Sequence, residues 1–195
     1  MKTIVFLLEE LSAKIMLNAI LPKLLPEDVD YKCISFDGKQ DLEKQLALKI
    51  RAWLAPNTCF LIMRDQDSED CLHVKERLAG IVAQTGKARF CVIRIACHEL
   101  ESFFLGDLAA VEQGLSLDRL VKKQNSKKFR NPDELANPSE EIKKLNHGAY
   151  PKIKGSEMIS PHLKLDGSNR STSFNQLLKG ICKAIDTLED NKSLM

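Results

Sequence analysis

Two aspartates, Asp65 and Asp67, stand one residue apart in the stretch RDQDS, directly after the apolar run FLIM. Carboxylates placed this close repel one another and resist desolvation unless a cation, a base or open water receives them. Hard divalent cations with oxygen ligands are the usual partners of such groups in proteins. The stretch therefore suggests a Mg²⁺ or Mn²⁺ site that includes Asp65 and Asp67.

Further acids follow two other apolar runs of the chain, and they are Glu9, Glu10, Glu99 and Glu101. Residues two apart in an extended chain point the same way, so Asp65 with Asp67, and Glu99 with Glu101, are expected to converge. Two ions about 4 Å apart would activate a water and stabilise the leaving oxygen of a phosphodiester. These acids thus indicate a two-metal hydrolase.

Each acid also has an ordinary structural explanation. Glu9 and Glu10 precede a helical pattern and would favour its dipole, and Asp67 or Ser68 is suited to cap the helix that follows, each at about 1 kcal/mol or less. The coincidence of acids after three apolar runs favours the metal hypothesis. A calcium-binding EF-hand is rejected because Asp70 stands where its loop needs glycine, and because a strand-like run precedes the loop.

The elements that must position these acids alternate along the first hundred residues. Short β-rich runs separated by amphipathic helical patterns predict a parallel sheet with crossover helices. Strands are expected over residues 2–9, 31–36, 58–63 and 88–96, with helices beginning near residues 12, 41 and 68. In such sheets ligands bind at the carboxyl ends of the strands, where the acids stand.

Helical patterns dominate after residue 98. Helices are expected over residues 99–114 and 116–123, after Asn131 and Ser139, and from about residue 170 onward. Of the whole-chain net charge of +2, residues 1–118 contribute 14 basic and 18 acidic side chains, and the remainder 15 and 9. This asymmetry is compatible with a polyanionic partner, although a solvated helical surface gives the same pattern.

Composition points to one soluble core in a reducing compartment. The 195 residues are 44% hydrophobic, and no run reaches the roughly 20 uncharged apolar residues of a membrane helix. We therefore expect a cytoplasmic protein with no membrane partner, and reduced thiols at its six cysteines. A zinc site is disfavoured because two of its four candidate ligands are adjacent; the four are Cys71, His73, Cys97 and His98.

A glutamate after the first strand and an Asp-x-Asp after the third resemble the Toprim domain, the fold of topoisomerases, primases and OLD-type nucleases. The segments FLLEELSAKIML, RDQDSEDC, ACHELESFFLGD, YPKIKGSEMISPHL and NRSTSFNQL together resemble the bacterial domain-of-unknown-function family 4276 over nearly the whole chain. This resemblance implies a Toprim-like Rossmannoid α/β core over residues 1–115, whose parallel four-stranded sheet is flanked by helices. A basic helical extension over residues 116–195 would pack on that core.

The resemblance also implies an activity and partners. It suggests a Mg²⁺-dependent nuclease for DNA or RNA, encoded beside an ABC-type or AAA-type ATPase in antiphage defence modules. In that setting Glu9 would bind metal or act as general base, and Asp65 and Asp67 would bind metal. Glu99 or, preferably, Glu101 would complete the second ion's shell. Toprim domains usually carry a Glu-Gly pair after the first strand, where this chain has Glu9 and Glu10. The glycine turn that lets a substrate phosphate approach the backbone is therefore missing.

Basic and hydroxyl side chains of the second half supply candidates for phosphate binding. Lys152 and Lys154 would stabilise charge on the reacting phosphate or the leaving group. Arg170, Ser171 and Ser173 stand where a helix begins and would bind a phosphate there, unless a serine is simply the cap. The nucleic-acid backbone would follow a basic run that surrounds Phe129, which is placed to stack a base: Lys122, Lys123, Lys127, Lys128 and Arg130.

Three other functional classes remain open. A receiver-like signalling domain needs a hydroxyl residue after its fourth strand, where this chain has CHELE, and a lysine after a fifth strand that is not evident. A Mn²⁺-dependent Asp-x-Asp transferase leaves the acids of the first strand unexplained. An inactive Toprim-like subunit of an ATPase complex shares the fold with the nuclease, and Phe103 and Phe104 would suit its partner surface unless the core buries them. A homodimer is compatible with the sequence.

Overall fold

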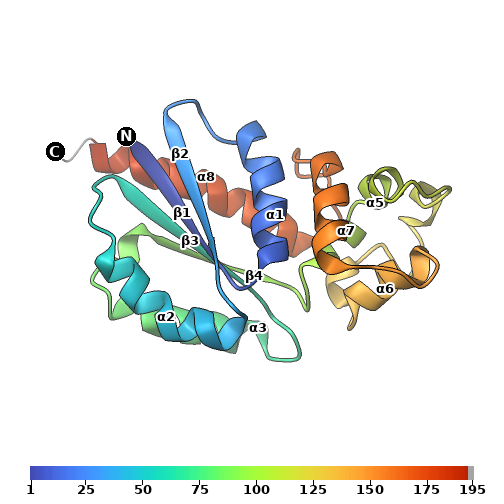
Figure 1. Ribbon diagram of the computed structural model, residues 1–195, viewed down its shortest axis with the longest axis horizontal. Coiled ribbons are helices and arrows are strands. Elements are labelled where there is room, and N and C mark those ends of the chain that lie inside the picture. The colour runs from blue at the N-terminus through green and yellow to red at the C-terminus, as the bar shows by residue number, and fades with distance from the viewer. Residues whose placement is uncertain (193–195) are drawn as a thin grey trace.

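The computed structural model describes residues 1–192, and its centre is a four-stranded sheet. The strands are β1 (Lys2–Leu8), β2 (Val29–Ser35), β3 (Thr58–Asp65) and β4 (Cys91–Ala96). They run parallel in the order β2-β1-β3-β4 (Figure 1). The α/β class with a four-stranded parallel sheet flanked by helices is thereby confirmed.

Three helices connect the strands, and they divide between the two faces of the sheet. Helix α1 (Leu11–Ile20) covers one face, whereas α2 (Lys39–Ala52) and α3 (Cys71–Ala83) cover the other. Right-handed crossovers require this division, because β2 lies on one side of β1 and β3 on the other. The direction of winding thus reverses between β1 and β3, and ligands of open α/β sheets bind at such a switch point.

The second half of the chain completes the face that α1 begins. Helix α8 (Thr172–Lys192) packs beside β3 and β4 on that face. Between β4 and α8 lie α4 (Glu101–Leu105), α5 (Leu108–Gly114), α6 (Pro138–Leu145) and α7 (Lys152–Ile159). Figure 1 shows α5, α6 and α7 gathered past the carboxyl ends of the strands. Short 3₁₀ turns complete the chain at Leu21–Lys23, Ala88–Phe90, Val121–Lys123, Pro132–Glu134 and Ser160–His162.

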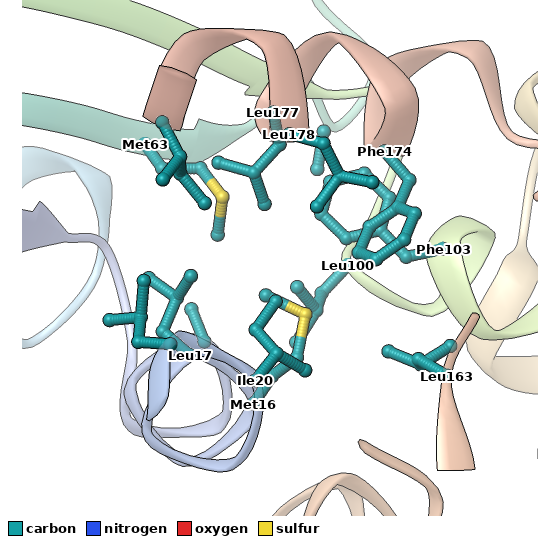
Figure 2. Packing of buried hydrophobic residues seen from close by; sticks show 14 of the residues in the cluster. Met16, Leu17, Ile20, Met63, Leu100, Phe103, Leu163, Phe174, Leu177 and Leu178 are labelled. Carbon is teal, nitrogen blue, oxygen red and sulfur yellow. The ribbon is translucent and has the colours of Figure 1, made fainter. Parts of the chain in front are cut away.

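One hydrophobic cluster joins the sheet to both helices of its first face. Figure 2 shows α1 side chains facing α8 side chains, with β3 and the segment after β4 between them. The labelled members are Met16, Leu17, Ile20, Met63, Leu100, Phe103, Leu163, Phe174, Leu177 and Leu178. Phe103 and Phe104 are both buried in this cluster, so they are core residues and form no partner surface. The residue-115 boundary stays a prediction, although sheet and later helices share this core.

The opposite face has its own cluster, built from the alternate residues of the same strands. Val5 and Leu7 of β1, with Phe60 and Ile62 of β3, pack against apolar stripes of α2 and α3. Those stripes are Leu42, Leu46 and Ile50 in α2, and Val74, Leu78 and Val82 in α3. Because side chains alternate along a strand, each strand residue is assigned to the α1 face or the α2 face by its position alone.

Several predicted helices differ from those observed. The predicted helix over residues 116–123 is wrong, because Ser116 and Arg119 have positive φ angles of 54° and 64° and only Val121–Lys123 forms a 3₁₀ turn. The predicted helix over 99–114 is broken into α4 and α5 around Asp107, whose side chain caps α5. Helix α7 was not predicted; it includes Gly155, where a Cβ atom would lie 2.1 Å from the Tyr150 ring.

Among the described residues, no helix is both long enough and apolar enough to cross a membrane.

A candidate acidic site at the switch point

The acids at the ends of β1 and β3 divide between the two faces of the sheet. Leu8 and Met63 are register partners and belong to the α1 face. Asp65 continues the alternation of Met63, so its side chain lies on the α1 face, and Arg64 lies on the α2 face. The contacts of Arg64 agree, because its partners Glu43 and Glu69 belong to α2 and to the segment just before α3.

On the α2 face, Arg64 is the centre of an ion-pair network. Its guanidinium is fully buried and donates to Glu43 Oε1 at 2.6 Å, Glu69 Oε1 at 2.8 Å and the backbone carbonyl of Asp65 at 3.0 Å. Glu9 Oε2 lies 3.7 Å from Arg64 Nε. Arg77 binds Glu43 and Glu69 from the outside. The Arg77 and Arg64 hydrogen bonds lower the pKa of Glu69 to about 2.

Asp67 belongs to this network and not to a pair with Asp65. Its Oδ2 accepts from Lys39 Nζ at 2.8 Å and lies 3.8 Å from Arg64 Nη2. The expected convergence of Asp65 and Asp67 is wrong, because β3 ends at Asp65 and Asp67 has a φ of 57°, so the chain is no longer extended. The cap of the next helix is also neither Asp67 nor Ser68, since Asp70 accepts from the N–H groups of Leu72 and His73.

Glu9 bridges the ends of the two central strands. Its Oε2 accepts a hydrogen bond from the backbone N–H of Asp65 at 3.0 Å. Burial raises the pKa of Glu9, which this hydrogen bond and Arg64 only partly oppose. Through this hydrogen bond Glu9 connects the end of β1 to the end of β3.

On the α1 face, Asp65 and Glu101 form a buried acidic pair. Burial raises the pKa of Asp65 well above its usual value, and Glu10, Glu9 and Glu101 add to this shift. Glu101 is fully buried, and its carboxylate oxygens make no full hydrogen bond among the described residues, although the Tyr150 hydroxyl interacts with them. The pKa of Glu101 is raised to about 7, chiefly by burial. The charged forms of these two acids therefore lack most of the compensation that buried carboxylates need.

Lys152 supplies the positive charge of this face. Its Nζ lies 3.8 Å from Glu101 Oε2 and 3.7 Å from Glu99 Oε1. Burial acts to lower the pKa of Lys152, but the nearby carboxylates of Glu101, Glu10 and Glu99 outweigh it and raise the pKa. At these distances the contacts are long-range ion pairs rather than hydrogen bonds. Glu101 and Lys152 thus attract each other without satisfying the Glu101 oxygens.

Three further side chains surround the pair. Glu99 accepts from the backbone N–H of Ser139 at 2.8 Å, so it also holds the start of α6. Glu10 accepts from the Ser12 hydroxyl and is itself the N-cap residue of α1. Tyr150 Oη is buried and makes no full hydrogen bond, but it lies close to Glu101: burial raises the pKa of this phenol, and its interaction with the Glu101 carboxylate raises the pKa further.

A family model described as "Domain of unknown function (DUF4276)" matches residues 8–181 of the chain. The chain belongs to this family. No curated protein and no solved structure matches it. The DUF4276 match covers β2, β3 and β4, the acidic pair, Lys152 and the first part of α8, but only the last residue of β1.

The other candidate residues of this DUF4276 protein lie away from the acidic pair. Lys154 is exposed and pairs with Glu157 at 2.9 Å. Ser171 caps α8, since its Oγ accepts from the Phe174 N–H at 3.0 Å. The Asp133 carboxylate also occupies this helix start, accepting from Ser171 Oγ and from the Ser173 N–H at 2.7 Å each. An internal carboxylate thus stands where a phosphate was expected.

The basic run offers no stacking platform. Phe129 is buried, with Lys128 Nζ 5.6 Å from its ring centroid, and Lys128 also pairs with Glu141. Arg170 donates to Asn125 Oδ1 at 3.0 Å on the surface. The prediction that Phe129 stacks a base is therefore not supported by its position in the core.

The donor set of the α1 face is chemically suited to a hard cation. Glu10, Asp65, Glu99 and Glu101 supply only oxygen, which Mg²⁺ and Mn²⁺ prefer. The Glu101 oxygens, which make no full hydrogen bond among the described residues, are the atoms that a cation would satisfy. As the side chains are placed in residues 1–192, no three acidic, histidine or cysteine side chains are grouped to hold a metal ion. Cation binding would require Glu10 to leave Ser12 and Lys152 to withdraw.

Sequence reasoning missed Arg64 and Tyr150, and it named Glu10 only as one of the acids after the first strand. Alternation along the strands carried a signal for the place of Glu10, since extending the register pair Leu8–Met63 by two residues puts it beside Asp65. Arg64 could have been found as a cation inside an otherwise apolar run. Tyr150 comes from a segment far from the strands, and no local pattern connects it to them.

Proposed function

We propose that this DUF4276 protein is a divalent-metal-dependent phosphodiester hydrolase that acts on nucleic acid. The carrying observation is the fully buried Glu101 carboxylate near buried Asp65 at the switch point, for which Lys152 at 3.8 Å is the only ion-pair partner among the described residues. Buried carboxylates with so little compensation are costly, and they concentrate at functional sites. The cation would be held by the carboxylates of Asp65, Glu101 and Glu10, and Glu99 would add a further carboxylate.

The roles of the chain's own residues follow from their contacts. When bound, Mg²⁺ or Mn²⁺ would supply an activated water and positive charge at the leaving oxygen. Burial favours the protonated form of Glu101, and binding of a cation would release that proton. Lys152, then no longer needed to neutralise Glu101 and Glu99, would become available to a substrate phosphate. Glu9 and Asp67 stay with Arg64 and keep the strand ends in place.

The finer assignment rests on resemblance. The Glu9 and Asp65-x-Asp67 motif resembles Toprim domains, and the family resemblance suggests an effector of a bacterial antiphage module that works with a partner ABC-type or AAA-type ATPase. DNA and RNA are both candidate substrates.

The test pairs a metal-binding measurement with a cutting assay. Mn²⁺ binding, followed by electron paramagnetic resonance, is expected for the wild type and is expected to be lost in Asp65→Asn and Glu101→Gln. The control is Asp67→Asn, whose side chain lies on the α2 face and which should keep Mn²⁺ binding. Plasmid DNA, single-stranded DNA and tRNA are then incubated with each variant and Mg²⁺ or Mn²⁺. Loss of binding in Asp67→Asn but not in Asp65→Asn would refute this assignment of the site.

A second candidate function is a non-catalytic subunit of an ATPase complex. The observation that favours it is Lys152, which already stands among the carboxylates as an internal cation. In that case the acidic pair would be a structural charge cluster, Mn²⁺ would not bind to the wild type, and no nucleic acid would be cut. Mn²⁺ binding without cutting would instead indicate that the metal site needs the partner for activity.

A further inference from the structure

A pocket of about 510 Å³ lies along the outer edge of β4, and it shares no residue with the acidic pair or Lys152. Helix α3 borders it on one side and the start of α8 on the other, and the 3₁₀ turn Pro132–Glu134 lies at one end. Its lining includes Lys75, Ile93, Ile95, Glu134, Arg170 and Thr172. Since β4 is the last strand of the sheet, this pocket occupies the place of a fifth strand.

The edge of β4 presents backbone groups to this pocket. The Ala96 carbonyl accepts from the Gln66 N–H at 2.9 Å, so the backbone groups of Ala96 face β3. Bonded residues alternate along a parallel strand, and the groups of Ile93, Ile95 and Cys97 therefore face outward. The Ile93 carbonyl accepts from Arg94 Nη1 and the Cys97 N–H donates to Ser173 Oγ. The N–H of Ile93 and both backbone groups of Ile95 thus face away from β3 and toward the pocket.

The side chains around this edge carry an excess of free positive charge. Lys75 and Arg170 are exposed and form no ion pair with a described carboxylate, and Arg94 donates only to backbone carbonyls. The acids of the lining are Asp133 and Glu134. Asp133 is already neutralised at the N-terminus of α8, where it accepts two hydrogen bonds. A segment that enters here would therefore meet cations on both the α3 side and the α8 side.

The shape of the pocket selects a single extended chain over a second copy of the protein. The edge of β4 lies inside the pocket, which is lined by α3 on one side and the start of α8 on the other, so the edge is recessed between two helices. Two such recessed edges cannot approach each other closely enough to pair. One extended peptide can enter, because it needs only the width of a strand, about 5 Å.

We propose that this groove binds an extended acidic segment of a partner polypeptide, which adds to the sheet as a fifth strand beside β4. Backbone hydrogen bonds to Ile93 and Ile95 provide the pairing, and Lys75 and Arg170 select acidic side chains on the two faces of the added strand. The site does not depend on metal binding or on cutting of nucleic acid.

The test uses a pooled set of fluorescein-labelled hexapeptides in which every position is Glu or Val, read by fluorescence anisotropy on the full chain. Peptides with several Glu residues are expected to bind, and a matched set with Lys in place of Glu is expected not to. N-methylation of alternate amides in the best peptide should weaken binding at least about tenfold, since it removes backbone hydrogen bonds without touching the protein. The N–H of Ile95 should shift in NMR spectra when peptide binds.

Variants of exposed side chains complete the test. The double variant Lys75→Glu and Arg170→Glu should lose binding by about tenfold or more, whereas Lys122→Glu with Lys123→Glu, which makes the same change in net charge elsewhere, should keep it. The proposal is overturned if no Glu-containing peptide binds at about 1 mM. It is equally overturned if the Lys set binds as well, if N-methylation has no effect, or if only a single-stranded oligonucleotide binds at Lys75 and Arg170.

Discussion

Glu9 Oε2 accepts a hydrogen bond from the Asp65 N–H at 3.0 Å and lies 3.7 Å from Arg64 Nε. This carboxylate thereby connects the end of β1 to the end of β3 and to the buried cation beneath them. The two neighbouring residues at the end of β3 thus have opposite surroundings. Arg64 forms ion pairs with four carboxylates, whereas Asp65 is surrounded by other acids.

The first prediction concerns Arg64. Arg64→Met would leave Glu43 and Glu69 without their buried partner, and we expect the free energy of unfolding to fall by about 3–5 kcal/mol in urea titrations. Arg77→Met removes a partly exposed arginine from the same acids and should cost about 1 kcal/mol or less. Equal losses in the two variants would show that Arg64 is not the centre of the network.

The second prediction is a dependence of stability on pH that Glu101 causes. Burial raises its folded pKa from 4.5 to about 7, so between these values the native state keeps a proton that the unfolded state has lost. The free energy of unfolding must then fall as the pH rises through this window, by roughly 3 kcal/mol, and level off above pH 7.

Glu101→Gln isolates this effect from that of Asp65, which acts in the same direction. The variant should be more stable than the wild type at pH 8 and should show a flatter profile between about pH 5 and pH 8 in urea titrations. Glu157→Gln replaces an exposed glutamate and should follow the wild type. Parallel profiles for the wild type and Glu101→Gln would contradict the assigned pKa.

The third prediction compares two helical glycines. A Cβ atom at Gly180 of α8 would lie 2.6 Å from Arg94 Nε, so Gly180→Ala should displace Arg94 and destabilise the protein by about 1–3 kcal/mol. A Cβ atom at Gly80 of α3 meets nothing within 4 Å, so Gly80→Ala should stabilise the protein by about 0.5–1 kcal/mol through helix propensity. Thermal unfolding of both variants checks the opposite signs.

The fourth prediction concerns the start of α8. Ser171→Ala removes the acceptor of the Phe174 N–H and one partner of Asp133, and it should lower the free energy of unfolding by about 1–2 kcal/mol. Ser168→Ala, at an exposed residue three positions earlier, should change it by less than about 0.5 kcal/mol. An unchanged stability of Ser171→Ala would show that Asp133 alone holds the helix start.

Strands β1, β3 and β4 could be predicted from the sequence because each is a short, mostly apolar run. Strand β2 (Val29–Ser35) carries Asp30 and Lys32, and its start was predicted two residues too late. The crossover helices followed from the same pattern, since Leu42, Leu46 and Ile50 recur at helical spacing. The segment after β4 was harder, because positive φ angles at Ser116 and Arg119 and the close contact of Gly155 with Tyr150 depend on tertiary packing.

The location of the candidate site could be predicted from the sequence, but not which residues form it. Acids after three strands indicated the carboxyl edge of the sheet, but the chain leaves the extended conformation at Asp67, and this turns its carboxylate to Lys39. Glu101 and Lys152 were both named beforehand, yet only the fold brings α7 back against α4 and makes Glu101 fully buried.

The contacts of Arg64 also constrain how this protein can change over evolution. The Arg64 guanidinium forms ion pairs with Glu9 after β1, Glu43 in α2 and Glu69 before α3. A substitution at one of these positions therefore affects the others. A homologue with an apolar residue at position 64 should have given up the acids at 43 and 69 as well. Joint replacement of these three positions is therefore expected wherever the network has been lost.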